Sequence, residues 1–365
     1  MIPATEHISR QTAICETILA PRKRFSVDKY PKDDVGAPNM IFTVTTVVVL
    51  AIGLLTLALA LYGGFVSSSI IEGLKGDQAS IGISEQKYYL LGLIGVVVLI
   101  ARIFDVPIFF WMLQSLVPYC PGAMCAYGVV NAGAPYSLAA IALKLFVPFF
   151  YGLWLIVENA NRGQAELPMM KDLARSFLFL LLPLVLVDSA LDILVVSFVK
   201  PIYLPCCSSI YDVDPPFSPS AYLGPEVGTT IAALTVVVTL SVVVIQWSGQ
   251  QSNLARMVTV GLCFAAAALY FVALHDTYAP AVLGLSTHHC PYCLFQEFPD
   301  TALFSGLFWL GIASAGWRLA LQVTWTRKGL NPEAIGSMLG LLRKVSSVAL
   351  VFSITSMISH WLLVL

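Results

Sequence analysis

A C-x-x-C pair preceded directly by two histidines combines the residue types in this sequence that are best suited to chemistry. His288, His289, Cys290 and Cys293 lie together in STHHCPYCLFQEFPD, residues 286–300. Thiols at this spacing can close a disulfide, exchange that disulfide with another thiol, or bind a soft metal ion. The stretch therefore leaves three interpretations open, namely a structural disulfide, a redox centre and a metal site.

Under the redox interpretation, Cys290 and Cys293 are the candidate catalytic residues. A C-x-x-C near a helix N-terminus has its thiolate stabilised by the helix dipole, which lowers the thiol pKa. Protonated His288 and His289 would add positive charge beside it. We expect the two cysteines to be bonded to each other or to hold a metal, and not to remain as two idle thiols.

Two further cysteine pairs are candidates for redox partners or structural disulfides. Cys120 and Cys125 stand in CPGAMC, and Cys206 and Cys207 stand in PCC. The three pairs recur at nearly equal intervals, which permits a three-fold repeat of helical hairpins. Apart from nearby Pro and Tyr residues, no internal similarity accompanies this spacing.

The CPYC loop resembles, at the level of the motif, the C-x-x-C loops at the outer membrane face of the vitamin K epoxide reductase and DsbB-type quinone-linked disulfide families. Those families have four-helix cores and a second, shuttling cysteine pair. The resemblance implies a quinone as electron acceptor, with CPGAMC or the adjacent Cys206 and Cys207 in the role of the second pair. It covers about ten residues, and this chain has more predicted spans than those cores.

The metal interpretation uses the same loop differently. His288 and His289, with His275 and Asp276 where the loop begins, could join the thiols as ligands of zinc or copper. A covalent c-type haem is excluded because no C-x-x-C-H motif is present. A b-type haem would need axial histidines from facing helices, and only His275 and His360 lie at or in predicted spans.

The elements that position these residues must be membrane-spanning helices. Of the 365 residues, 58% are hydrophobic and only 11% are charged, and the mean hydropathy is +0.82. A soluble domain carries about 25% charged residues, so the composition predicts an integral membrane protein. The 20 basic and 21 acidic residues give no sign of nucleic-acid binding, and no Walker A, HExxH or G-x-S-x-G motif is present.

The predicted fold is an all-α polytopic membrane protein with a polar tail over 1–39 and a single helical transmembrane domain over 40–365. A bilayer core needs about 20 apolar residues of helix. Pro107 is a potential kink point in the second span, and 330–344 predicts a short amphipathic surface helix. Eight stretches qualify as spans: 41–66, 88–117, 136–157, 176–199, 228–247, 254–275, 302–325 and 345–365.

The distribution of basic residues predicts the orientation. Loops 118–135, 200–227 and 276–301 contain one basic residue, Lys200, whereas the loops of the opposite side contain many. The positive-inside rule places the basic loops in the cytoplasm. The three cysteine pairs then all face the oxidising side, which predicts a bacterial inner membrane or an equivalent membrane with extracytoplasmic cysteine loops. The basic N-terminal tail disagrees with this parity, so its side stays open.

Five ionisable residues lie inside the predicted spans, where such residues are costly and often functional. Counted from the outer end of each span, their depths agree within about one helical turn, which predicts a single polar cluster between spans two, three and four. Arg102 is expected to pair with Asp105 or Asp188, and Lys144 with Asp192. A structural ion-pair network and a proton or ligand site are both compatible with this set. The residues are Arg102, Asp105, Lys144, Asp188 and Asp192.

Three functions are compatible with these patterns. The first is thiol/quinone-linked electron transfer at the extracytoplasmic cysteine loops. The second is a non-enzymatic membrane subunit that anchors or bridges a larger respiratory or extracytoplasmic complex through protein partners. The third is a proton-coupled transporter that uses the intramembrane charges. The lipid bilayer is the partner common to all three.

Overall fold

The computed structural model is entirely helical over the residues that it describes, and it is an all-α polytopic membrane protein. Within these residues, eight helical segments are long and apolar enough to cross a membrane. The N-terminal tail over 1–39, with Cys15, and the PCC cysteines Cys206 and Cys207 lie outside the described residues. The structure describes 42–75, 78–120, 123, 125–164, 166–199, 218–248, 252–285 and 288–364.

The first four spans form a closed ring in chain order, with each helix packed against the next and the fourth against the first. Thr43 starts the first helix with a capping box, in which its side chain accepts from Thr46 N. A π-helical turn at Phe177–Leu181 joins α6 and α7 into one span. The helices of this first ring are α2 (Val44–Gly73), α3 (Gln78–Ser115), α5 (Tyr136–Arg162), and α6 (Met170–Ser176) with α7 (Leu182–Phe198).

The last four spans repeat this arrangement as a second ring. Pro225 and Pro299 each occupy a first-turn position of a helix, where the missing N–H has no intrahelical partner to lose. A π-helical turn at Leu274–Tyr278 carries the second helix of this ring onward into a short terminal helix. The helices are α10 (Pro225–Trp247), α11 (Asn253–Ala273) with α12 (Ala279–Leu283), α14 (Pro299–Arg327) and α15 (Gly336–Val364).

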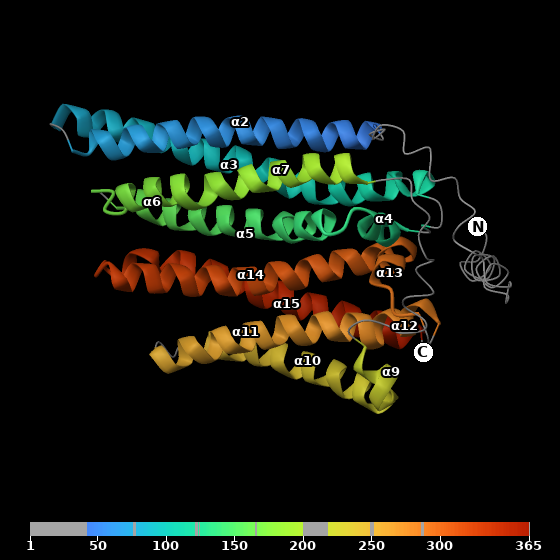
Figure 1. The fold of residues 1–365 in the computed structure, drawn as a ribbon. Coiled ribbons are helices and arrows are strands. Elements are labelled where there is room, and N and C mark those ends of the chain that lie inside the picture. The colour runs from blue at the N-terminus through green and yellow to red at the C-terminus, as the bar shows by residue number, and fades with distance from the viewer. Residues whose placement is uncertain are drawn as a thin grey trace.

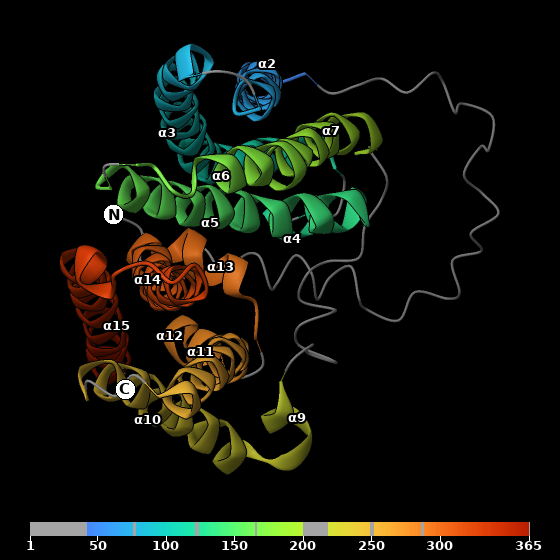
Figure 2. The same cartoon turned by 90° about the vertical axis from the view of Figure 1, so that its left-hand side faces the viewer.

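The two rings meet where α5 faces α14, as Figure 2 shows in a view along the helices. The indole Nε1 of Trp317 donates a hydrogen bond of 3.0 Å to the Phe149 carbonyl. The aromatic side chains of Phe149 and Trp317 also stack, with ring centroids 5.9 Å apart. Gly152 makes this approach possible, because a Cβ there would lie 2.7 Å from Trp317 Cζ2. At this joint, Trp317 of α14 therefore packs directly against Gly152 of α5.

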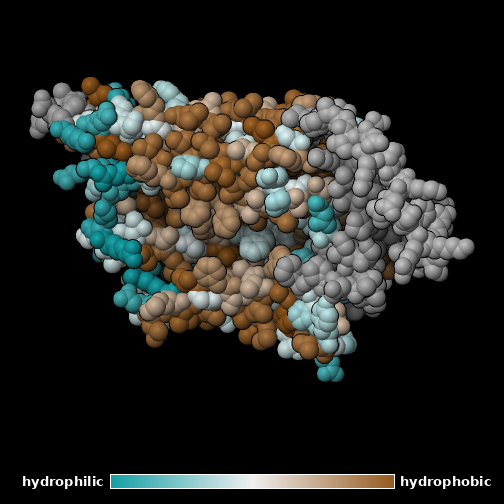
Figure 3. Space-filling view, viewed as in Figure 1, coloured by the Kyte–Doolittle hydropathy of each residue, from teal (hydrophilic) through white to brown (hydrophobic). Residues whose placement is uncertain are grey.

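Three short helices lie together at one end of the molecule (Figure 1). They are α4 (Ala126–Ala132), α9 (Pro219–Leu223) and α13 (Pro291–Glu297). All three belong to the loops that the sequence analysis assigned to the cysteine-bearing side, so the described parts of those loops share one end. Hydrophilic residues gather at the opposite end, and an apolar belt separates the two ends (Figure 3). This belt is the surface that contacts the lipid bilayer.

The structure confirms the number of spans and corrects one element. The stretch 330–344 is not a separate surface helix, because a 3₁₀ turn at Pro332–Ile335 leads directly into α15. Gly336 has helical backbone angles, with φ −56° and ψ −43°, and Ile335 is buried in a hydrophobic cluster that includes residues of both rings. The apolar face that suggested a surface helix is used for packing within the bundle. α3 continues through Pro107 without interruption.

Candidate functional sites

The five intramembrane charges meet in the centre of the first ring. Arg102 and Asp105 come from α3, Lys144 from α5, and Asp188 and Asp192 from α7. None of the five is more than 1% exposed. The i,i+4 spacing on α7 places both of its carboxylates on the face that points into the ring.

Lys144 stands at the centre of this charge cluster. Its Nζ atom is 2.6 Å from Asp105 Oδ2, 3.2 Å from Asp188 Oδ1 and 2.8 Å from Asp192 Oδ1. The ammonium also lies over the ring of Phe109, 5.2 Å from its centroid. The amine therefore occupies the position that a bound cation would take among three carboxylates.

Arg102 joins the same carboxylates from the other side and extends the network to α2. Its Nη1 atom is 2.6 Å from Asp188 Oδ2 and 3.2 Å from Asp105 Oδ2. Its Nη2 atom donates a hydrogen bond of 2.6 Å to Ser189 Oγ. Ser189 in turn donates to the Gly53 carbonyl at 3.1 Å. All four spans of the first ring are thus linked through one buried network, and each predicted pairing has become a shared contact.

Three thiols meet at the end of the molecule that carries the short helices. The Sγ atoms of Cys125, Cys290 and Cys293 all lie within 4.8 Å of one another; we call them the thiol trio. Cys125 immediately precedes α4 of the first ring, and Cys290 immediately precedes α13 of the second. The trio therefore bridges the two rings.

Local contacts hold both short helices in place. Gln114 on α3 caps α4 by accepting a hydrogen bond of 3.0 Å from Ala126 N. Leu294 anchors α13, since it is fully buried and its N–H donates to the Cys290 carbonyl at 3.2 Å. Tyr127 of α4 and Tyr292 of α13 face each other beside the thiols, with ring centroids 5.5 Å apart.

The structure regroups the predicted cysteine pairs. No disulfide joins the described cysteines, so Cys290 and Cys293 are thiols within reach of each other; of the two expected states, the bonded pair is not formed, and the metal-holding state stays a prediction. Cys120 packs in the hydrophobic core of the first ring and is not part of the trio. CPGAMC therefore does not supply a pair of its own, because the chain turns Cys125 toward α13 and Cys120 toward the core.

The electrostatics of Cys290 also differ from the expectation. Hydrogen bonding with Cys125 and burial together raise the pKa of the Cys290 thiol to about 12, although Cys293 opposes the shift. The helix-dipole argument predicted a lowered pKa. α13 has only 7 residues, and Cys290 is fully buried, so desolvation and a neighbouring thiol outweigh the short helix.

The predicted histidine ligands lie near the trio in sequence but belong to a different group. His289 Nδ1 is 2.8 Å from Ser218 Oγ and 3.0 Å from the His275 carbonyl. Ser218 also donates to Asp276 Oδ1 at 2.7 Å. His288 is also buried, and none of the described histidines joins the thiol group that could hold a metal ion.

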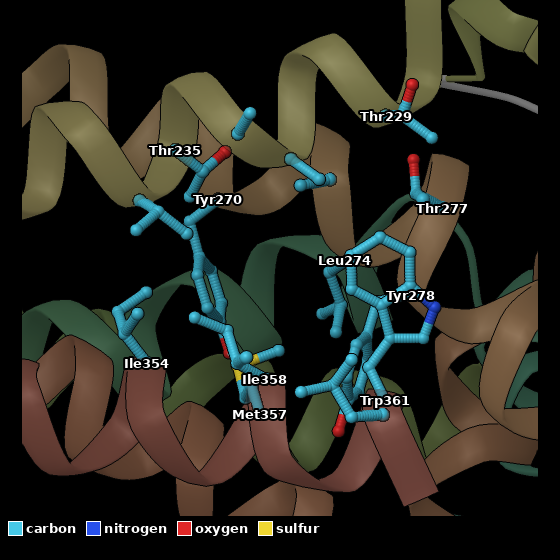
Figure 4. A pocket seen from close by; sticks show the side chains of 15 residues that line it. Thr229, Thr235, Tyr270, Leu274, Thr277, Tyr278, Ile354, Met357, Ile358 and Trp361 are labelled. Atoms are coloured by element: carbon cyan, nitrogen blue, oxygen red, sulfur yellow. The ribbon is translucent and has the colours of Figure 1, made fainter. Parts of the chain in front are cut away.

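Beside this histidine group, α10, α11 and α15 enclose a cavity of about 410 Å³ (Figure 4). Tyr270, Tyr278 and Trp361 are its aromatic walls, and Thr229 and Thr277 stand at one end. A second hollow of about 470 Å³ shares those two threonines and is lined by Asp276 and His289. Neither cavity has a cysteine in its lining.

Comparison with known proteins gives this chain no family. No protein-family model matches it, and neither the curated proteins nor the solved structures contain a match. Any function must therefore be argued from the residues of the chain itself.

Sequence reasoning missed two features of these sites. It paired Cys125 with Cys120, although the shared end of loops 118–135 and 276–301 was a signal that their cysteines could meet. It also set aside Arg318, because a long side chain near the end of a span can reach water unaided, and it did not group this residue with Arg256 and Arg343.

Proposed function

We propose that the protein is a membrane-bound thiol–disulfide oxidoreductase whose reactive centre is the thiol trio. The observation that carries this proposal is the placement of three Sγ atoms within 4.8 Å of one another. Two thiols suffice for a structural disulfide. A third thiol beside them can attack that disulfide, and this is the arrangement that intramolecular exchange requires.

The exposure of the three residues supports distinct roles. Cys293 is partly exposed, whereas Cys125 and Cys290 are 2% and 0% exposed. An incoming disulfide would therefore meet Cys293 first. Its thiolate attacks one sulfur of the incoming disulfide and forms a mixed disulfide, and the other sulfur leaves as a thiolate. Cys290 then attacks Cys293 Sγ, closes Cys290–Cys293 and releases the second substrate thiol.

Cys125 extends this exchange across the joint between the rings. Its thiolate can attack Cys290 Sγ, which forms Cys125–Cys290 and returns Cys293 to the thiol state. Each step breaks one S–S bond and forms another, so electrons balance without an additional oxidant. The two electrons and two protons gained by the substrate come from the two cysteines that end as a disulfide. An incoming disulfide is favoured over a quinone because no cysteine lines the cavities beside α10 and α11.

The surroundings favour disulfide chemistry over metal binding. The trio forms a small buried cluster with Tyr127 and Tyr292 against it. Three metal-bound thiolates would place negative charge among these groups, whereas a disulfide is neutral. The raised pKa of Cys290 has the same consequence, because metal binding must first remove its proton.

Thiol trapping tests the proposal directly. The protein is treated with a small aromatic disulfide, quenched with acid, and its cysteines are mapped by mass spectrometry. We expect Cys290–Cys293 and Cys125–Cys290 disulfides in the wild type. An accumulated mixed disulfide on Cys293 is expected in the double variant Cys125→Ser, Cys290→Ser, which lacks both neighbouring thiols. Cys263→Ser is the matched control, since Cys263 lies within α11. Trio thiols that neither exchange nor form mixed disulfides would leave a non-enzymatic subunit, and zinc or copper retained by the purified protein would establish a metal site.

We also propose that the trio faces the extracytoplasmic side. Support comes from the basic residues, because the loops at the end of the trio contain few of them and the loops at the opposite end contain many. After reduction, a membrane-impermeant thiol reagent added outside intact cells should label Cys293. Labelling that needs broken cells would reverse the orientation.

Proton-coupled transport is the second candidate function, and the charge cluster is the observation that favours it. Three carboxylates face two cations, so a fully ionised cluster carries a net negative charge in a dry core. Asp105 Oδ1 is buried without a hydrogen-bond partner and is the oxygen available for a proton. Proton uptake by proteoliposomes in response to an added substrate, lost in Asp105→Asn, would establish this function. Uptake that is unchanged in this variant would exclude the cluster from it.

A further inference from the structure

Three arginines converge on one cavity at the end of the second ring opposite the thiol trio. The cavity has a volume of about 530 Å³ and lies between α11, α14 and α15. Arg256, Arg318 and Arg343 line it, one from each helix. Glu333 is the only acidic residue among its described lining residues. With all four groups ionised, the lining carries a net charge of +2.

The guanidinium groups of this arginine cavity lack counterions among the described residues. The Nε atom of each arginine is buried without a hydrogen-bond partner, and no ion pair of the described chain includes any of the three. A buried donor without an acceptor is destabilising, and more so when it is charged. Three such donors around one space therefore indicate a ligand with several acceptor oxygens.

Neighbouring residues hold two of the guanidiniums at the cavity. The Cζ atom of Arg343 lies 4.2 Å from the centroid of the Trp247 ring, which fixes the guanidinium by a cation–π contact. Arg256 Nη1 is 3.4 Å from Asn253 Oδ1. Gly336 and Gly340 form part of the wall, and a Cβ at either position would meet no atom within 4 Å. The wall beside the arginines therefore leaves room.

The chemistry of the lining selects the class of ligand. A guanidinium presents planar pairs of donors that match two oxygens of a phosphate, and phosphate is the anion that clusters of arginines recognise best. Gln322 and Thr326 add neutral polar groups to the lining, and Trp325 and Leu339 add apolar surface. The cavity lies where α11 begins and α14 ends, at the hydrophilic end of the bundle.

We propose that the arginine cavity binds a phosphate-bearing ligand at the membrane surface opposite the thiol trio. The phosphate sits between the guanidiniums of Arg256, Arg318 and Arg343. Two sources share this chemistry, namely the headgroup of an anionic phospholipid and a water-soluble phosphate or pyrophosphate. The site is independent of the thiol trio, and its test does not depend on the proposed oxidoreductase function.

The experiment uses the whole protein and measures binding of defined probes. In one arm, native mass spectrometry counts phosphatidic acid or phosphatidylcholine retained from mixed vesicles. In the other arm, calorimetry follows pyrophosphate added to protein in neutral detergent. We expect binding in at least one arm, no binding of phosphatidylcholine, and about tenfold weaker binding in Arg318→Gln, because this variant loses a hydrogen bond between charged groups.

Two further variants keep the test decisive if Arg318→Gln disturbs the fold. Arg327→Gln is the matched control, because Arg327 is exposed at the same end of α14 and does not line the cavity. Glu333→Gln should tighten binding by removing the only acidic lining group, a gain that a structural role would not produce. Retention in the lipid arm alone identifies a headgroup site, and binding in the pyrophosphate arm alone identifies a soluble ligand. Equal losses in Arg318→Gln and Arg327→Gln, or no binding in either arm, would overturn the proposal.

Discussion

The two rings share a helix arrangement and differ in what their centres bury. The first ring is built around the charge cluster of α3, α5 and α7. The second is built around an aromatic pair, in which the Tyr270 and Phe308 rings stack with centroids 3.8 Å apart. Its described charged groups lie toward its two ends instead, in the Asp276–His289 group and the arginine cavity.

This difference suggests that the first ring mainly stabilises the fold, whereas the second ring provides the cavities in which a ligand could bind. Buried ion pairs favour one register of α3, α5 and α7, since a misplaced turn of any of these helices would strand a charge. The neutral centre of the second ring imposes fewer constraints, and the three cavities described above lie against its helices. We therefore expect substitutions to affect stability most in the first ring and ligand binding most in the second.

The largest expected effect comes from removing the central amine of the first ring. Lys144→Met leaves three buried carboxylates with Arg102 alone, and breaking a buried ion pair in this way costs about 3–5 kcal/mol. The free energy of unfolding, measured by denaturant titration in detergent micelles, should fall by that amount or the protein should fail to accumulate. Lys171→Met, at an exposed position of α6, is the control. Equal stability of the two variants would refute a structural role for the cluster.

A smaller effect is expected at the joint between the rings. Gly152→Ala places a Cβ 2.7 Å from Trp317 Cζ2, and overpacking of this kind costs about 1–3 kcal/mol. Gly306→Ala is the matched control, because its new Cβ would meet no atom within 4 Å. Denaturant titration should show a loss for the first variant and none for the second. A loss in both would show that the effect is not specific to the joint, since alanine is the better helix former and helix propensity alone would raise stability.

The alkylation rate of the thiol trio should depend steeply on pH. Since the pKa of Cys290 is raised to about 12, its thiolate fraction, and hence its alkylation rate, should grow about tenfold per pH unit from pH 7 to 10. Peptide mapping after iodoacetamide treatment measures this rate. The pKa shift also sets the direction in which stability changes with pH. Because the thiol pKa in the folded protein lies above its ordinary value of 9.0, the protonated thiol favours the folded state and deprotonation disfavours it. Stability should be lost between about pH 9 and 12, whereas alkylation already complete at pH 7 would contradict the burial of this thiol.

The smallest effect is expected in the centre of the second ring. Ser305→Ala removes the 2.6 Å hydrogen bond between Ser305 Oγ and Tyr270 OH, and hydrogen bonds between membrane helices average about 0.6 kcal/mol. Tyr270 OH keeps its contact with Met357 Sδ at 3.3 Å. Ser241→Ala, at a partly exposed position, should change stability less. If the Ser305 variant lost as much stability as Lys144→Met, the contrast between the rings would fail.

The spans could be predicted from the sequence because twenty apolar residues in a row have few alternatives to crossing a bilayer. The charge cluster followed from depth, since ionised side chains at the same level of neighbouring helices are drawn together. The packing order of the helices could not be read in this way. Apolar helix faces look alike in composition, so the sequence does not indicate which helices pack together. Equal spacing of the cysteine pairs permitted a three-fold repeat, whereas the structure shows two rings of four helices.

The thiol trio shows where local reasoning reaches its limit. Spacing within CPYC correctly placed Cys290 and Cys293 within reach of each other, but the third thiol comes from a distant loop. Only tertiary packing decides that Cys125 turns toward α13 while Cys120 turns inward. The predicted direction of the Cys290 pKa shift was wrong for the same reason, since burial and a neighbouring thiol are properties of the fold and not of the motif.

Closure of each ring within one half of the chain has a consequence for how the protein can be assembled. Each half crosses the membrane an even number of times, so both halves begin and end on the same side, and each inserts as two helical hairpins with no crossing borrowed from the other. A chain cut between Val199 and Ser218 keeps every described helix intact. The two pieces, made as separate polypeptides in the same cell, should find each other in the bilayer through α5 and α14 and copurify.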